Sequence, residues 1–128
     1  MVLVANRGEI ARRIFRTCRD MGISTAAVYS DADMDARHVA EADVAVRLPG
    51  VSPAETYLRP DLLVDAALRV NAAAVHPGYG FLSATAGFAR LCAANGLPLV
   101  GPPPDAIEAR GSTPAAKATP AAAGVPTL

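Results

Sequence analysis

Residues 74–83 (Ala-Val-His-Pro-Gly-Tyr-Gly-Phe-Leu-Ser) contain the side chains and glycines best suited to hold a ligand. The apolar run that leads into this stretch predicts a short buried strand, which Pro77 ends because proline cannot donate a hydrogen bond to a sheet. Gly78 and Gly80 allow another group to come close to the main chain, and Ser83 is suited to cap a following helix. In a parallel sheet such loops lie where ligands bind. The alternative is a structural turn with its aromatic side chains in the core.

Four further side chains belong to types that take part in binding or catalysis. His76 could act as a general base or a ligand, although a lone histidine at a strand end is more often a hydrogen-bonded structural residue. Asp31 and Asp33 follow a predicted strand, where dinucleotide-binding folds carry a ribose-binding carboxylate. They are also typical turn residues. His38 is expected on a solvated helix face.

The glycine spacing matches the dinucleotide-binding fingerprint only in part. Gly78-x-Gly80-x-x-Ser83 lacks the last glycine and does not follow the first strand, where that fingerprint is found. The sequence also contains no Walker loop, catalytic-triad motif or metal-ligand cluster. We therefore assign no catalytic residue and no metal ligand from the residues themselves.

Composition excludes several classes of protein. A length of 128 residues predicts one domain with a real core. Twelve acidic and twelve basic side chains balance, so no nucleic-acid or membrane partner is expected. No apolar run approaches the roughly 20 residues that span a membrane, and Arg7 and Glu9 interrupt any early secretory signal. Cys18 and Cys92 fall at apolar helix positions, which indicates buried, reduced thiols and a cytoplasmic protein.

Strands and helices are predicted to alternate along the chain. The expected strands are 2–5, 25–29, 44–48, 72–75 and 97–100, and the expected helices are 9–21, a short one ending near 42, 60–70, one that ends at 95–96, and 105–110. Such alternation implies right-handed crossovers and a parallel sheet covered on both faces. The predicted fold is an open, doubly wound α/β sheet of the Rossmann-like kind. Residues 111–128 are rich in alanine and interrupted by proline, so they are expected to form a separate, frayed segment.

Several short motifs follow one another in a fixed order along the chain. They are 5–11 (Ala-Asn-Arg-Gly-Glu-Ile-Ala), 28–30 (Val-Tyr-Ser), Asp33, His38, 42–43 (Ala-Asp), 52–58 (Ser-Pro-Ala-Glu-Thr-Tyr-Leu), 76–83, 101–102 (Gly-Pro) and 123–126 (Ala-Gly-Val-Pro). Together they closely resemble the amino-terminal, pre-ATP-grasp domain of biotin carboxylases. The motif at 76–83 is the most specific of them, and the resemblance covers essentially the whole chain.

The resemblance implies a role in an ATP-dependent ligase. In this family ATP and bicarbonate form carboxyphosphate, CO2 passes to biotin on a carrier domain, and Mg2+ bridges the ATP phosphates. The enzyme serves acyl-CoA or pyruvate carboxylases. The implied partners are the remaining biotin carboxylase domains, the biotin carboxyl carrier and the carboxyltransferase, with a homodimer left open. Residues 1–110 would form the amino-terminal domain and 111–128 a linker toward an ATP-grasp lid domain, which should begin near Leu128.

The resemblance also implies site residues. Gly78, Tyr79 and Gly80 are the candidates that line the active cleft and bind a cofactor, with Lys117 as a weaker candidate. Arg16 and Asp20, on the first predicted helix, correspond to residues of the family's dimer interface.

Two departures from the family pattern bear on activity. After Ser83 the family usually has Glu-Asn-Ala, whereas this chain has Ala-Thr-Ala, so a carboxylate is missing. The lysine expected to contact ATP falls at Thr113, and threonine supplies no positive charge to phosphate. Lys117 lies a helical turn later and is a poor substitute. We expect the chain to bind no cofactor firmly and to be inactive by itself.

Two other functions are compatible with the sequence. The chain could be a non-catalytic, truncated paralogue that keeps the dimer helix and binds a full carboxylase. It could also be a small Rossmann-like nucleotide-binding protein, although the dinucleotide fingerprint is incomplete.

Overall fold

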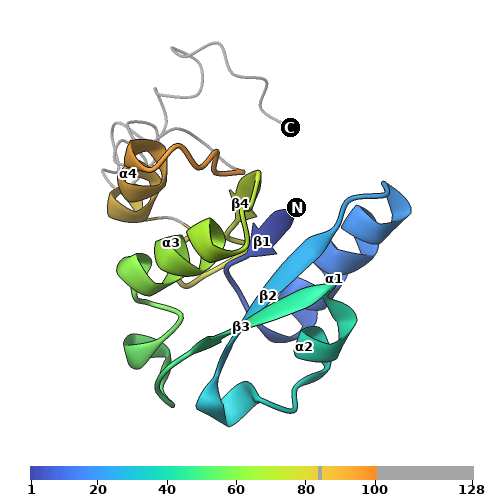
Figure 1. Cartoon of the computed structure of the whole chain (residues 1–128). Helices are drawn as coiled ribbons and strands as arrows, with labels where there is room; N and C mark the ends of the chain where they lie inside the picture. The colour runs from blue at the N-terminus through green and yellow to red at the C-terminus, as the bar shows by residue number, and fades with distance from the viewer. Residues whose placement is uncertain (84, 101–128) are drawn as a thin grey trace, which may run out of the picture.

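A computed structural model describes residues 1–83 and 85–100 and shows an α/β fold with a four-stranded parallel sheet. The strands are β1 (Val2–Val4), β2 (Thr25–Ser30), β3 (Val44–Leu48) and β4 (Ala74–His76), in the spatial order β3-β2-β1-β4. The helices are α1 (Gly8–Asp20), α2 (Arg37–Glu41), α3 (Pro60–Arg69) and α4 (Ala86–Ala94), and two 3₁₀ turns, η1 (Asp31–Asp33) and η2 (Pro53–Glu55), follow β2 and β3 (Figure 1). The predicted fold class is confirmed.

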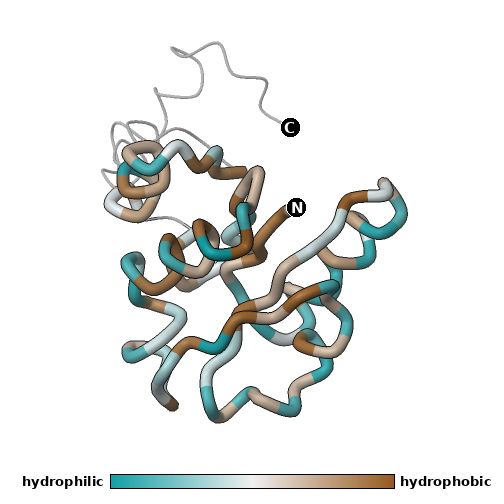
Figure 2. The backbone as a smooth tube through the Cα atoms, viewed as in Figure 1, coloured by the Kyte–Doolittle hydropathy of each residue, from teal (hydrophilic) through white to brown (hydrophobic). Residues whose placement is uncertain are grey.

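The sheet is covered on both faces. Helices α1 and α2 lie on one side and α3 and α4 on the other (Figure 1). Strand β1 is central, so its residues alternate between two buried clusters: Leu3 packs with the α3 and α4 side, and Val4 with the α1 side. Figure 2 shows β1 as a hydrophobic segment and many hydrophilic residues along α1.

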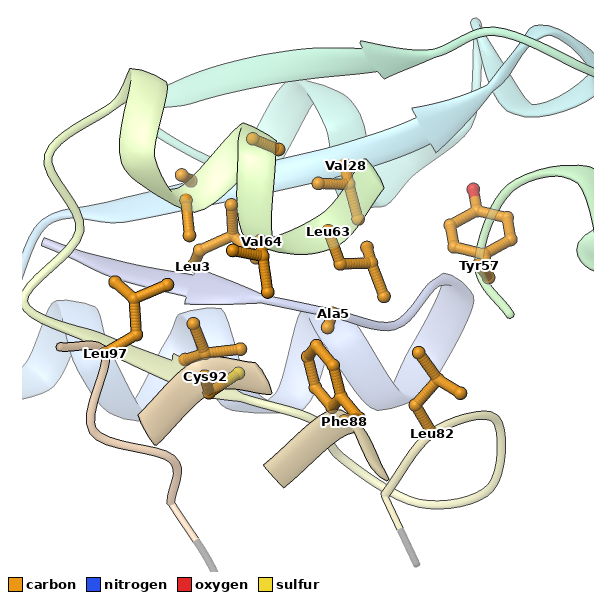
Figure 3. Packing of buried hydrophobic residues seen from close by; sticks show 14 of the residues in the cluster. Leu3, Ala5, Val28, Tyr57, Leu63, Val64, Leu82, Phe88, Cys92 and Leu97 are labelled. Carbon is orange, nitrogen blue, oxygen red and sulfur yellow. The ribbon is translucent and has the colours of Figure 1, made fainter. Parts of the chain in front are cut away.

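The larger core lies between the sheet and helices α3 and α4. Leu63 of α3 faces Phe88 of α4 and Leu82 of the loop before it, with Tyr57 at the edge of this cluster (Figure 3). Cys18 and Cys92 are buried and free, as expected. Burial raises the pKa of both thiols, that of Cys92 to about 11, so the thiols stay protonated and unreactive near neutral pH.

Two expectations about local structure are wrong. Residues 97–100 do not form a full fifth strand, since only one bridge joins Leu99 to Val75. Pro98 has no N–H to extend that pairing, although its carbonyl accepts from Val75 N at 2.8 Å. Ser83 does not cap the next helix: α4 begins at Ala86, and Thr85 holds the N-cap position without a side-chain hydrogen bond. The predicted helix 105–110 and the segment 111–128, with Thr113 and Lys117, lie outside the described residues.

Candidate functional site

A depression of about 410 Å³ lies where β1 and β4 end at the carboxyl edge of the sheet. Parallel pairing brings the two strand ends together, since Ala5 N donates to His76 O at 2.8 Å. The walls come from the turn after β1 and from the loop after β4. Its lining residues are Asn6, Arg7, Glu9, Ile10, Tyr79, Gly80 and Phe81.

Asn6 joins the two walls of this depression. Its buried side-chain amide donates to the carbonyl oxygens of Pro77 at 2.9 Å and Tyr79 at 2.6 Å. Its Oδ1 accepts from the Arg7 main-chain N–H at 2.8 Å. Each of these bonds satisfies a main-chain group that is not part of a helix or strand. One side chain therefore fixes the shape of residues 77–79, which we call the glycine loop together with Gly80 and Phe81.

The two glycines of this loop have different surroundings. Gly78 has φ +66°, and a Cβ there would lie 2.7 Å from Ile10 Cγ2 and 2.9 Å from Asn6 Nδ2. Gly80 has φ +68° with no atom within 4 Å of such a Cβ. Gly78 thus allows the loop to pack against α1, whereas Gly80 and the 75% exposed Tyr79 line the depression.

The His76 side chain, at the end of β4, forms a hydrogen bond with the glycine loop. Its Nδ1 accepts a hydrogen bond from the Gly78 N–H at 3.1 Å. Burial lowers the pKa of His76 below its usual value, so the ring is neutral at physiological pH. These contacts favour the structural interpretation of His76 over a role as base or ligand.

A network that the sequence did not predict surrounds Arg7. The Arg7 guanidinium, about half exposed, donates to Asp33 Oδ1 at 2.6 Å and lies 5.7 Å above the centre of the Tyr57 ring. The Tyr57 hydroxyl donates to the other oxygen of Asp33 at 2.7 Å and accepts from Ser30 N at 3.1 Å. Tyr57 also contacts Phe81, whose ring stacks on it with the two ring centres 5.3 Å apart. The sequence contained a signal for this network, since all five of its residues belong to the motifs that carry the family resemblance.

Burial and the Asp33 bond raise the pKa of Tyr57 to about 12, so its hydroxyl keeps its proton. Asp33 is therefore a buried acceptor within the fold. Asp31 pairs with Arg47 through two bonds of 2.6 and 3.0 Å, and this pair holds the pKa of Asp31 below its ordinary value. Both aspartates contact groups of this chain, which favours the turn interpretation over ribose binding.

His38 corrects another expectation, because it is fully buried and not on a solvated face. Its Nδ1 accepts from Gly8 N–H at 3.3 Å. Its Nε2 must then carry the proton and donate to the Val28 carbonyl at 3.0 Å. The short helix α2 packs beside α1 and β2, so the side of α2 that carries His38 faces the protein.

Arg16 and Asp20 lie on the exposed face of α1 and do not line the depression themselves. Arg16 Nη2 contacts Glu9 Oε1 at 2.8 Å, an exposed pair that contributes little stability. Their predicted role at an interface rests on this exposure and on the family resemblance.

Within the described residues, no group of three His, Cys, Asp or Glu side chains is placed to hold a metal ion. None of the helices described is long and apolar enough to cross a membrane.

Comparison with known proteins identifies the family. Residues 1–107 match the family model described as biotin carboxylase, N-terminal domain. The chain is 59% identical over 125 residues to the mitochondrial methylcrotonoyl-CoA carboxylase subunit alpha of Oryza sativa. The aligned region covers 98% of this chain and 17% of that subunit.

Solved structures agree. The K. lactis urea amidolyase matches with a TM-score of 0.90 and 46% identity over 99% of this chain and 8% of that one. The biotin carboxylase domain dimer of the Hydrogenobacter thermophilus 2-oxoglutarate carboxylase, solved with MgADP, ADP and bicarbonate, matches with a TM-score of 0.86 and 49% identity. That match covers 99% of this chain and 28% of the Hydrogenobacter domain chain. The chain thus spans less than a third of these proteins, and it belongs to the biotin carboxylase N-terminal domain family.

Proposed function

We propose that this chain forms one wall of the active cleft of a biotin carboxylase, which uses ATP and bicarbonate to carboxylate carrier-bound biotin. The observation that carries the proposal is the glycine loop, which Asn6 holds at the carboxyl edge of the sheet with Tyr79 and Gly80 toward solvent. Ligands of open α/β sheets bind at that edge. Residues 1–110 would be the domain and 111–128 the linker to an ATP-grasp lid.

The described residues do not by themselves fit magnesium-bound ATP. Phosphoryl transfer needs several cations and a metal around the phosphates. Of the residues that line the depression, Arg7 alone carries positive charge, and Asp33 already neutralises it. The described residues include no carboxylate cluster for a metal. ATP, Mg2+ and biotin would therefore bind with groups of the remaining domains, and the isolated chain would be inactive.

A chimeric enzyme tests this proposal. The chain replaces the matching segment of the Hydrogenobacter biotin carboxylase domain, and biotin-dependent ATP hydrolysis is measured for the chimera and for the chain alone. We expect activity only in the chimera. Hydrolysis by the isolated chain would contradict the claim that it is incomplete, and a folded but inactive chimera would contradict the proposed function.

The partners we propose are the other biotin carboxylase domains, a biotin carboxyl carrier, a carboxyltransferase and a second copy of the enzyme. The exposed face of α1 with Arg16 and Asp20 supports the last of these. That face also suits the second candidate function, a non-catalytic module that binds a full carboxylase. We propose a cytoplasmic location, because the free, buried thiols of Cys18 and Cys92 fit a reducing compartment.

A further inference from the structure

The glycine loop contains one residue other than glycine that has a positive φ. Phe81 has φ +47°, in the left-handed region that side chains other than glycine seldom adopt. Such a conformation costs free energy and persists only where surrounding contacts hold it. The contacts at Phe81 therefore decide whether the loop keeps its shape.

The Tyr57 ring stacks on Phe81, which also packs against the larger core cluster. The two rings lie 5.3 Å apart and are inclined by 18°, a stacked pair. Tyr57 is itself fully buried, and it comes from the segment after η2, which is distant in sequence from the loop. The stack therefore connects the glycine loop to the segment after η2, which the hydrogen bonds of Asn6 to the loop do not involve.

Asp33 fixes the Tyr57 ring. One Asp33 oxygen accepts the Tyr57 hydroxyl at 2.7 Å, and the other accepts Arg7 Nη2 at 2.6 Å. The hydroxyl also accepts from Ser30 N at 3.1 Å. A ring held at its hydroxyl and stacked on its face has little freedom to turn. The end of β2 is thereby tied to both walls of the depression, through Arg7 on one side and Phe81 on the other.

We propose that Tyr57, oriented by Asp33, is a positioning residue that holds the glycine loop in its ligand-binding shape through Phe81. Tyr57 itself lies outside the depression lining and would touch no ligand. The inference rests on the proposed function, since it assigns the loop's supports within that same site.

The test follows the side-chain amide protons of Asn6 by NMR in the 128-residue chain, because this amide donates to the loop carbonyls of Pro77 and Tyr79. We expect Tyr57→Leu to speed exchange of these protons with water about tenfold, the factor that loss of one aromatic stack allows. Phe15→Leu is the matched control, since Phe15 is also a fully buried ring but lies in the cluster on the α1 face. Equal acceleration in both variants would overturn the proposal.

A double-mutant cycle separates positioning from general loosening. If Tyr57 acts through Phe81, the pair Tyr57→Leu and Phe81→Leu will accelerate exchange no more than the stronger single variant. Effects that multiply would show independent action and overturn the proposal. We expect Asp33→Asn to accelerate exchange as well, because it weakens the contacts that orient Tyr57, and an unchanged rate would remove Asp33 from the proposal.

The Hydrogenobacter chimera supplies the functional readout. We expect Tyr57→Leu to lower kcat/KM for biotin-dependent ATP hydrolysis about tenfold, with Phe15→Leu at the same folded fraction lowering it less than twofold. An effect of Tyr57→Leu no larger than that of Phe15→Leu would overturn the proposal. An inactive unmodified chimera would contradict the proposed function, whereas the exchange experiment on the chain alone would still decide whether Tyr57 positions the loop.

Discussion

The contacts of Gly78 show how closely the glycine loop packs against α1. A Cβ at this position would overlap both Ile10 Cγ2 and Asn6 Nδ2, and the backbone is in the left-handed region. Gly80 shares that backbone conformation but has open space around it. Two glycines of one short motif therefore serve different purposes, close packing at Gly78 and conformation alone at Gly80.

This difference predicts the result of substituting alanine at each glycine. Gly78→Ala should lower the free energy of unfolding by roughly 2 to 4 kcal/mol, because it adds overlap to the strain of a positive φ. Gly80→Ala should cost about 1 kcal/mol, from conformation alone. Urea denaturation of the chain measures both. Equal losses would show that packing against α1 is not the reason for glycine at position 78.

His76 predicts a dependence of stability on pH. Burial lowers its pKa in the folded chain below the ordinary value of 6.5, so the unfolded chain binds a proton more readily. The contribution of neutral His76 to the free energy of unfolding is therefore complete above about pH 6.5. It is lost as the pH falls from there toward the pKa of His76 in the folded chain.

His76→Asn is the variant that tests this linkage, because its amide oxygen offers an acceptor near the position of Nδ1, which bonds Gly78 N–H. We expect the variant to lose less stability than the unmodified chain between pH 7.5 and 5.5, measured by urea denaturation at each pH. A decline of the same size in both proteins would show that other groups cause it.

His38 connects three elements that lie apart in the sequence. It sits in α2, donates to Val28 of β2 and accepts from Gly8 at the start of α1. Because α1 begins at this point, the bond also fixes the turn that carries Asn6 and Arg7. A short helix thus helps to set the geometry of the depression without touching it.

Replacing His38 tests this link between elements. His38→Phe keeps a ring but removes the hydrogen bonds that His38 makes to the Val28 carbonyl and the Gly8 N–H, which should cost roughly 2 to 4 kcal/mol of unfolding free energy. His38→Gln should recover part of the loss, because its amide nitrogen can donate to Val28 as Nε2 does. Thermal and urea unfolding provide the measurement, and a fully stable His38→Phe variant would contradict a role for these bonds.

The proposed function assigns the domain two surfaces, the depression and the outer face of α1, which adjoin where Arg16 contacts Glu9 of the depression lining. The depression lies at the carboxyl edge of the sheet, and Arg16 and Asp20 lie on the outer face of α1. Because α1 packs on one face of the sheet and α3 on the other, a substitution on α3 leaves the α1 face unchanged.

Charge reversal on α1 should separate assembly from folding. In the Hydrogenobacter chimera we expect Arg16→Glu to weaken the dimer at least about tenfold, since like charges across an interface are costly. Stability should change little, because the Arg16–Glu9 pair is exposed. Arg69→Glu, an exposed reversal on α3, is the control. Sedimentation velocity would contradict the interface role if both variants, or neither, dissociated.

Much of the architecture was predictable because it depends on short-range patterns. The alternation of predicted strands and helices along the chain predicted the parallel sheet, and strand Val44–Leu48 has the predicted bounds. Pro60 begins α3, as expected of proline at a first helical position. The loop at Gly78 and Gly80 was equally visible, since glycines that follow a strand end indicate a turn.

The tertiary structure alone decided which polar side chains meet. The sequence neighbours of His38 and Asp33 include several charged residues, as is typical of surface segments, yet both residues are buried. Partners from β2, α1 and the segment after η2 form hydrogen bonds with their polar atoms. Burial of such groups is tolerable only with those partners, which come from 10 to 30 positions away. The sequence by itself therefore determined the sheet, the loop and the family resemblance, whereas the chain's three-dimensional packing decided the network that shapes the site.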